Sequence, residues 1–208
     1  MKPINQGLAN RLLYLMIPLF LASCASIPEM QILYRLPSPS DSLKGKEIAL
    51  TVRDDRKSKA ILKQGAREEF RGFTGNIALS VAAHDDEGFK VGTFPVTDLM
   101  IEATERRLEN QGIKAVTEKA PGTPELVILL KAFTLDIQGR DWSANIGYEA
   151  QLKINGRVLA SRIIDAKAER MKIVGRSQAD TLMSELFSDA LNALDLARLF
   201  AQAEALGH

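Results

Sequence analysis

Apolar and polar residues alternate most regularly over positions 142–154, where every second side chain is apolar or small. Asn155-Gly156 follows directly, and this pair favours a two-residue type I′ turn, because both of its positions need a positive φ. The alternation resumes after the turn and runs to Ile164. The pattern therefore predicts a β-hairpin over residues 142–164 with one apolar face. On that face we expect two cross-strand pairs, Leu152 with Leu159 and Tyr148 with Ile163.

Five other segments show the period of a strand or of a helix. Three have the two-residue period or the apolar run of a strand, namely residues 46–53, 76–82 and 126–137. Residues 97–111 and 177–199 have apolar side chains three and four positions apart, which is typical of amphipathic helices.

This order of elements predicts an α+β fold. A strand, a helix and a second strand predict a right-handed parallel crossover, and the hairpin extends the same sheet in antiparallel fashion. Each amphipathic helix has one apolar face to bury, and so does the hairpin. We therefore expect a two-layer domain in which a mixed sheet of about five strands carries both helices on one face.

The first 23 residues have the pattern of a secretory signal peptide. Lys2 and Arg11 are the charged residues that precede an unbroken apolar run, Leu12–Ala22. This run is too short to span a bilayer, which needs about 20 apolar residues, and it lacks the polar face of a surface-packed core helix. A basic start, a short apolar stretch and small residues before the cleavage point are typical of a leader that is removed on export.

Cys24 is the only cysteine of the chain and follows this run directly. A disulfide within the chain is excluded because Cys24 has no partner, and a free thiol would be a liability in an oxidising compartment. The residues Leu21-Ala22-Ser23-Cys24 resemble the lipobox of bacterial lipoproteins. The resemblance implies that the thiol receives a diacylglyceryl group, that cleavage occurs before Cys24, and that the new amino terminus is acylated, for instance with palmitate. Two or more acyl chains hold a protein firmly on a membrane.

The lipobox divides the chain into three parts. We expect residues 1–23 to be the signal peptide, residues 24–43 to be a lipidated tether rich in proline and serine, and residues 44–208 to be a single periplasmic domain. Within the tether, we expect the apolar stretch Ile32-Leu33-Tyr34 to dock on the domain as an edge strand. Ala25 stands where the enterobacterial sorting rule reads an aspartate as inner-membrane retention, so the resemblance to that rule favours the outer membrane.

The charge balance argues against nucleic acid as a partner. The chain has 27 lysines and arginines against 26 aspartates and glutamates, so there is neither the basic domain of a nucleic-acid binder nor a polybasic membrane patch. The sequence also lacks G-x-S-x-G, the P-loop, H-E-x-x-H and C-x-x-C, and His84–Glu87 reads as a solvated acidic turn. We therefore expect no enzyme activity, no cofactor and no metal.

Asp54, Asp55 and Arg56 form the densest charged cluster, at the end of the first strand of the domain. Such a strand end can bind a ligand. Alternatively, the cluster serves the structure, and we expect Asp55 to pair with Arg56 there.

A family resemblance rests on this strand end, Val52-Arg53-Asp54-Asp55-Arg56, together with the lipobox and the order of strands and helices over residues 12–200. These features resemble the YajG-type family of bacterial lipoproteins, with its V-x-D-x-R strand end. The family's function is largely uncharacterised. The resemblance implies an envelope location and a non-catalytic role, and it assigns no site residues.

Two functions remain open. The first is a lipid-anchored adaptor or assembly factor that contacts an envelope protein of unknown identity. The second is a binding module for a lipid, lipopolysaccharide or glycan, which acts as an auxiliary lipoprotein of a transport system. The second rests on Trp142 and Tyr148 beside a possible groove between helices and sheet. A deep apolar pocket would favour the binding module, and a filled core with an exposed apolar patch would favour the adaptor.

Overall fold

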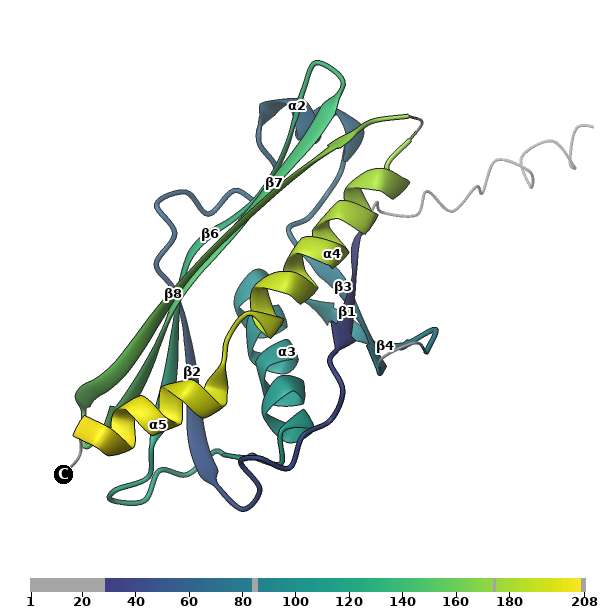
Figure 1. Cartoon of the computed structure of the whole chain (residues 1–208). Coiled ribbons are helices and arrows are strands. Elements are labelled where there is room, and N and C mark those ends of the chain that lie inside the picture. Colours follow the sequence, from purple (N-terminus) through teal and green to yellow (C-terminus); the bar gives the residue numbers. More distant parts are fainter. Residues whose placement is uncertain (1–28, 84–85, 174, 207–208) are drawn as a thin grey trace, which may run out of the picture.

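The computed structural model describes residues 29–83, 86–173 and 175–206, which fold into two sheets and the helices packed on them (Figure 1). The larger sheet has the order β5-β2-β6-β7-β8 and the smaller sheet has the order β1-β3-β4. The strands of the larger sheet are β2 (Glu47–Asp54), β5 (Lys114–Val116), β6 (Glu125–Gln138), β7 (Asp141–Ile154) and β8 (Arg157–Met171). Those of the smaller sheet are β1 (Met30–Leu36), β3 (Ile77–Ala83) and β4 (Phe89–Phe94). The helices are α2 (Gln64–Glu69), α3 (Val96–Asn110), α4 (Ser177–Asn192) and α5 (Leu196–Leu206).

The α+β prediction is confirmed, and so is the mixed five-stranded sheet. β2 and β6 are parallel neighbours with α3 between them in the chain, whereas β6, β7 and β8 follow as antiparallel neighbours. The prediction of a single sheet was incomplete, because the strand expected over residues 76–82 is β3, which pairs with β1 and β4. The chain leaves β2 through α2 and crosses to this second sheet, which packs against α3.

The predicted hairpin turn is confirmed, but its register differs by one residue. Asn155 and Gly156 have φ values of 50° and 79°, as a type I′ turn requires. The pairs are Leu152 with Ala160 and Tyr148 with Ile164, because a bulge leaves Leu159 without a partner across the strand. A one-residue shift moves side chains to the opposite face, so Ile163, expected inside, is 73% exposed.

The helix expected over residues 177–199 is two helices. α4 ends at Asn192 and α5 begins at Leu196. The Asp195 carboxylate accepts a hydrogen bond of 2.9 Å from the backbone N–H of Arg198, which is the geometry of a helix N-cap. The new start lets α5 contact β7 and β8 near the end of the strands that lies low in Figure 1, while α4 packs higher on them and on β1.

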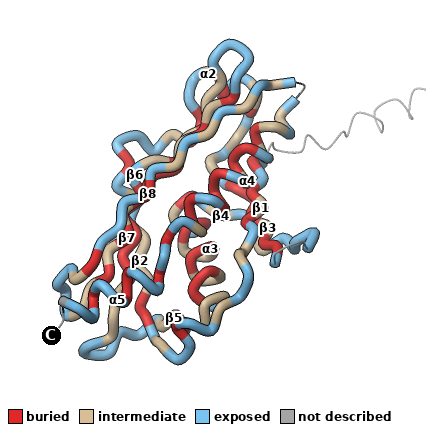
Figure 2. The backbone as a smooth tube through the Cα atoms, viewed as in Figure 1, coloured by how far each residue is buried: buried red, intermediate tan, exposed pale blue. Residues whose placement is uncertain are grey.

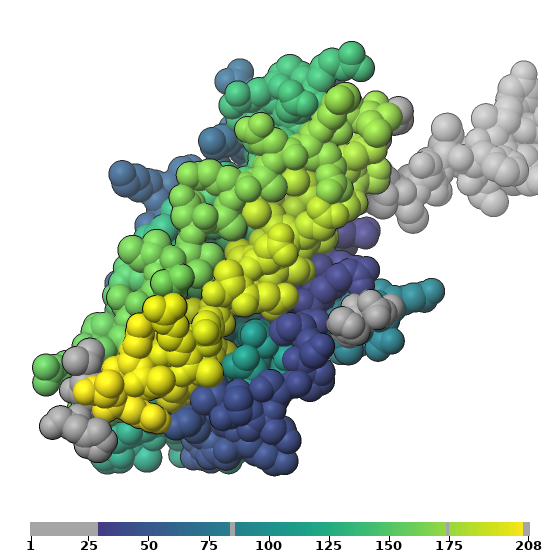
Figure 3. Space-filling model, in the orientation of Figure 1, coloured from purple at the N-terminus to yellow at the C-terminus, as the bar shows by residue number. Residues whose placement is uncertain are grey.

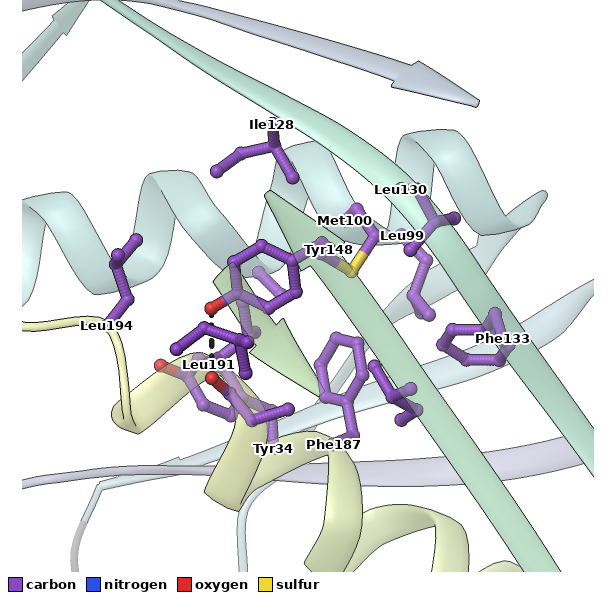
Figure 4. Close-up of a cluster of buried hydrophobic side chains, with 14 of the residues drawn as sticks. Tyr34, Leu99, Met100, Ile128, Leu130, Phe133, Tyr148, Phe187, Leu191 and Leu194 are labelled. Atoms are coloured by element: carbon purple, nitrogen blue, oxygen red, sulfur yellow. Dashed lines mark hydrogen bonds between the residues drawn. The ribbon is translucent and has the colours of Figure 1, made fainter. Parts of the chain in front are cut away.

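The core lies between the inner face of the five-stranded sheet and the helices (Figures 2 and 4). Tyr148 sits at its centre and donates a hydrogen bond of 2.9 Å to the backbone carbonyl of Ala190. The Phe187 ring meets the rings of Tyr34 and Phe133 edge to face, at 5.8 and 6.3 Å between centroids. Burial raises the pKa of both tyrosines, so that they stay neutral. Trp142 is buried as well, so the aromatic residues of the hairpin form core and not a binding surface.

The segment expected to form the tether contributes β1 to this core. Met30, Ile32 and Tyr34 alternate along β1 and are buried, and β1 is an edge strand of its sheet. The docking of Ile32-Leu33-Tyr34 on the domain is thus confirmed. Within the described part of the chain, each helix is too short or too polar to cross a membrane.

Candidate functional sites

Asp54 and the buried Arg56 form a partly buried ion pair at the carboxyl end of β2. The Arg56 guanidinium donates two hydrogen bonds of 2.9 Å to the two carboxylate oxygens of Asp54. Its Nη1 donates a third, of 3.3 Å, to the backbone carbonyl of Phe133. Lys59 Nζ lies 3.1 Å from the same carboxylate. Arg56 is 7% exposed, and most of the five N–H donors of its guanidinium form hydrogen bonds within the protein.

This pair fastens β2 to an irregular point of β6. The pairing of β2 with β6 ends at Asp54 opposite Leu130, and the ladder between β6 and β7 is interrupted by a bulge between Leu130 and Ala132. A bulge leaves backbone groups without their usual partners. Arg56 supplies a donor to the carbonyl of Phe133, just beyond the bulge. The cluster thus has a clear structural role.

Asp55, which we expected to pair with Arg56, pairs with other side chains instead. The Asp55 carboxylate turns outward, where it lies 3.1 Å from Lys131 Nζ and 3.8 Å from Arg53. Asp54 takes the inner position instead, and the hydrogen bonds from Arg56 hold the pKa of its carboxyl well below the ordinary 3.8. The two acids therefore have different roles: Asp54 is structural and Asp55 belongs to the surface.

An open groove of about 690 Å³ lies where α5 meets the far ends of β2 and β7. Its apolar floor includes Leu152, Ile154 and Phe200, and the turn at residues 121–124 forms one wall. Lys46 stands at the rim, with its Nζ 2.7 Å from the Glu204 carboxylate and 5.1 Å from the centre of the Phe200 ring. Apolar floors with a few polar groups at the edge are typical of sites for small amphiphiles. Sequence patterning could not reveal this groove, because its residues come from four separate segments.

A row of polar side chains on α4 covers the free edge of β1, and we call it the polar seam. It consists of Asp180, Ser184, Ser188 and Asn192. The first three accept hydrogen bonds of 2.9–3.1 Å from alternate backbone N–H groups of β1, those of Gln31, Leu33 and Arg35. Asn192 donates to the carbonyl of Arg35 at 3.0 Å. A helix here takes the place of the next strand, so that this edge is closed to strand pairing.

Cys24 lies outside the described residues, and so do His84 and Asp85. The described residues contain no group of three or more His, Cys, Asp or Glu side chains that could hold a metal ion.

Comparison with known proteins finds similarity of fold and no match of sequence. No family model matches the sequence, and no curated protein does either. A crystal structure from Xanthomonas campestris, of the family DUF330, superposes with a TM-score of 0.54 at 16% identity, over 87% of this chain and 98% of that one. The chain shares the fold of that protein.

Two further solved structures give lower scores. A minor lipoprotein from Acinetobacter baumannii has a TM-score of 0.42 at 12% identity, over 77% of this chain and 95% of that one. A lipoprotein described as putative, from Caulobacter crescentus, has a TM-score of 0.35 at 13% identity, over 53% of this chain and 83% of that one. The YajG-type assignment stays a prediction.

Proposed function

We propose that the chain is a bacterial lipoprotein, anchored by acylated Cys24 in the outer membrane, that acts in the periplasm by contact with other envelope proteins. One observation carries the proposal: the lipobox cysteine stands six positions before Met30, the first buried residue described. Six residues span at most about 22 Å. An acyl group on Cys24 would therefore hold the folded domain close to the membrane surface. The solved lipoproteins from other bacteria are consistent with this.

The structural role of the Asp54–Arg56 pair supports action by contact. The charged cluster that the sequence offered as either a binding or a structural site is engaged in holding β2 and β6 together. We infer from this that the domain presents surfaces to a protein partner, and we expect no catalysis and no cofactor.

Metabolic labelling of a bacterial host with a radioactive fatty acid tests the anchor. We expect the full chain to take up label and the Cys24→Ala variant to lose it and to accumulate as a larger precursor. Ser26→Ala, two residues away, serves as the matched control and should be labelled normally. Absence of label from both the wild-type chain and this control would contradict the proposal.

The same strains test the membrane address. Under the sorting rule, Ala25→Asp should move the labelled protein from the outer-membrane to the inner-membrane fraction. If the wild-type chain already fractionates with the inner membrane, the outer-membrane part of the proposal is wrong while the lipid anchor stands.

A second candidate function rests on the groove at α5. Its volume of about 690 Å³ and its apolar floor under Lys46 fit one acyl chain of an anionic amphiphile. In that case the chain would bind a lipid or lipopolysaccharide, as an auxiliary component of a transport system.

A further inference from the structure

Two large apolar side chains are exposed side by side where β8 ends. Met171 is 62% exposed and Ile173 is 74% exposed. Lys172, between them, points inward: its Nζ pairs with Glu69 and lies 5.9 Å from the centre of the Trp142 ring. Since alternate residues of an extended chain point to opposite sides, Met171 and Ile173 share the outward side. We call this pair the apolar tip.

The backbone at the apolar tip is held in place. The N–H of Lys172 donates a hydrogen bond of 2.7 Å to the carbonyl of Arg140, in the turn between β6 and β7. Just before it, Arg170 lies 2.5 Å from the Glu185 carboxylate on α4. The exposure of the two side chains is therefore imposed by the fold around them and is not a feature of a loose loop.

The apolar tip lies at the same end of the domain as the start of β1. The N–H of Gln31 donates to the Asp180 carboxylate at 3.1 Å, so β1 begins beside the first turn of α4. Ile173 and Asp180 are seven residues apart in the chain, a separation of at most about 25 Å. Figures 1 and 3 show the end of β8, the first turns of α4 and the start of β1 together at this end.

We propose that the apolar tip contacts the membrane that holds Cys24, with Met171 and Ile173 inserted among the lipid headgroups and upper acyl chains. The inference rests on the proposed lipid anchor. The length of chain before the domain favours a bilayer as the occupant, because Cys24 is at most about 25 Å of extended chain from Gln31. The anchor raises the local concentration of lipid at this end of the domain, and burial of two apolar side chains in the interface then stabilises one orientation.

This contact would give the domain one orientation relative to the membrane. The strands β6, β7 and β8 would rise from the bilayer, with the hairpin turn at Asn155-Gly156 at their distal end. The groove at α5 would face the periplasm, far from the anchor.

A thiol-specific fluorophore tests this orientation. The full chain is purified with its lipid and reconstituted into vesicles of phosphatidylethanolamine and phosphatidylglycerol, some with brominated acyl chains. Ile173→Cys is compared with Ile163→Cys, because Ile163 is 73% exposed on the same strand, about 26 Å from Met171. An acylated Cys24 takes no fluorophore, so that each variant has one labelled position.

We expect brominated lipid to quench the label at position 173 several-fold more than the label at position 163. A water-soluble thiol reagent should correspondingly modify unlabelled Cys at 173 several-fold more slowly than at 163 in vesicles, and equally fast in detergent. Equal quenching and equal modification at the two positions, in protein that floats with the vesicles, would overturn the proposal. The apolar tip would then be a surface for a protein partner.

Failure of the anchor itself gives a different result. If Cys24 is not acylated, the wild-type chain takes up the fluorophore and does not float with vesicles. That outcome contradicts the proposed lipoprotein function, whereas a floating protein with an unquenched tip contradicts only the orientation.

Discussion

At the scale of the residue, Asp54 and Asp55 show how position on a strand decides the role of a side chain. Ile48, Leu50 and Val52 face inward on β2, and Asp54 continues that series with the same two-residue period. Its carboxylate therefore meets the buried Arg56, while Asp55 faces outward. The same two-residue period that predicted the strand also predicts that Asp54 faces inward and Asp55 outward. Attention to the density of charged residues alone misses this difference.

Asp54→Ala should destabilise the domain by about 2–3 kcal/mol, because it leaves a buried guanidinium without its carboxylate. Asp55→Ala is the control and should change stability by less than about 0.5 kcal/mol, since its ion pairs are on the surface. Urea unfolding of the detergent-purified full chain measures both. Equal effects of the two substitutions would show that the inner pair does not stabilise the fold.

The same carboxylate gives stability a defined pH dependence. A carboxyl pKa that is lowered on folding contributes stability above the unfolded value of 3.8, and this contribution is lost as the pH falls through the lower, folded value. Asp54→Asn should therefore flatten the acid limb of the stability profile below about pH 4, as urea unfolding at a series of pH values would show.

At the scale of the element, α4 has two sequence patterns, the apolar stripe and the polar seam. The apolar positions, such as Leu182 and Phe187, predicted the helix and its buried face. Asp180, Ser184, Ser188 and Asn192 recur every four residues and form another row on the same helix. Serine and aspartate in a helix usually read as surface residues. Here their partners lie about 150 positions away in the chain, so the sequence could not reveal the row's purpose.

Ser184→Ala should cost about 1–2 kcal/mol, because it removes the hydrogen-bond acceptor of a part-buried backbone N–H. That N–H belongs to Leu33, and its bond to Ser184 Oγ is 2.9 Å long. Hydrogen exchange should therefore accelerate at β1 before it does so in the larger sheet. Thr181→Ala is the matched control, since Thr181 bonds only Ser177 within its own helix among the contacts described. Unchanged protection of β1 in Ser184→Ala would argue that the seam adds little.

The larger elements could be predicted from the sequence, and their pairing could be predicted only in part. The strands over 46–53 and 126–137 and the hairpin follow from local period, and their parallel and antiparallel order follows from connection rules. The second sheet could not be inferred, because nothing local tells β3 to pair with β1 and not with β2. The bulge at Leu159 was equally hidden, since an added residue leaves the apolar pattern almost intact. The break before α5 had a signal, Asp195, whose capping role an unbroken apolar stripe masked.

At the scale of the whole molecule, the apolar tip and the groove at α5 lie at opposite ends of the long strands. The apolar tip is at the end of β8, whereas the groove adjoins Ile154 and the hairpin turn. The fifteen residues of β8 span about 50 Å. A ligand in the groove would thus be held well away from the membrane if the tip contacts lipid.

The groove can be tested apart from the tip. If it accepts an acyl chain, the full chain should bind a fluorescent anionic lysophospholipid, and Ile154→Asn should weaken binding about tenfold through the loss of apolar contact. Val158→Asn is the control, because Val158 is an exposed apolar residue of the same hairpin that does not line the groove. Equal affinity in both variants, or no binding to the wild-type chain, would exclude the groove as an acyl site.

The spacing of the polar seam also sets how long the first strand can be. Four helical residues advance about 6 Å along α4, whereas two residues of β1 advance about 6.6 Å. The spacing of the seam side chains and the spacing of the N–H groups therefore differ by about 0.6 Å for each hydrogen bond along the strand. Three hydrogen bonds of 2.9–3.1 Å accommodate this difference. In a strand of twice the length, the N–H groups would no longer lie opposite the side chains of α4. The polar seam thus limits the length of β1, and a one-residue insertion within β1 would place its edge N–H groups opposite the wrong side chains of α4.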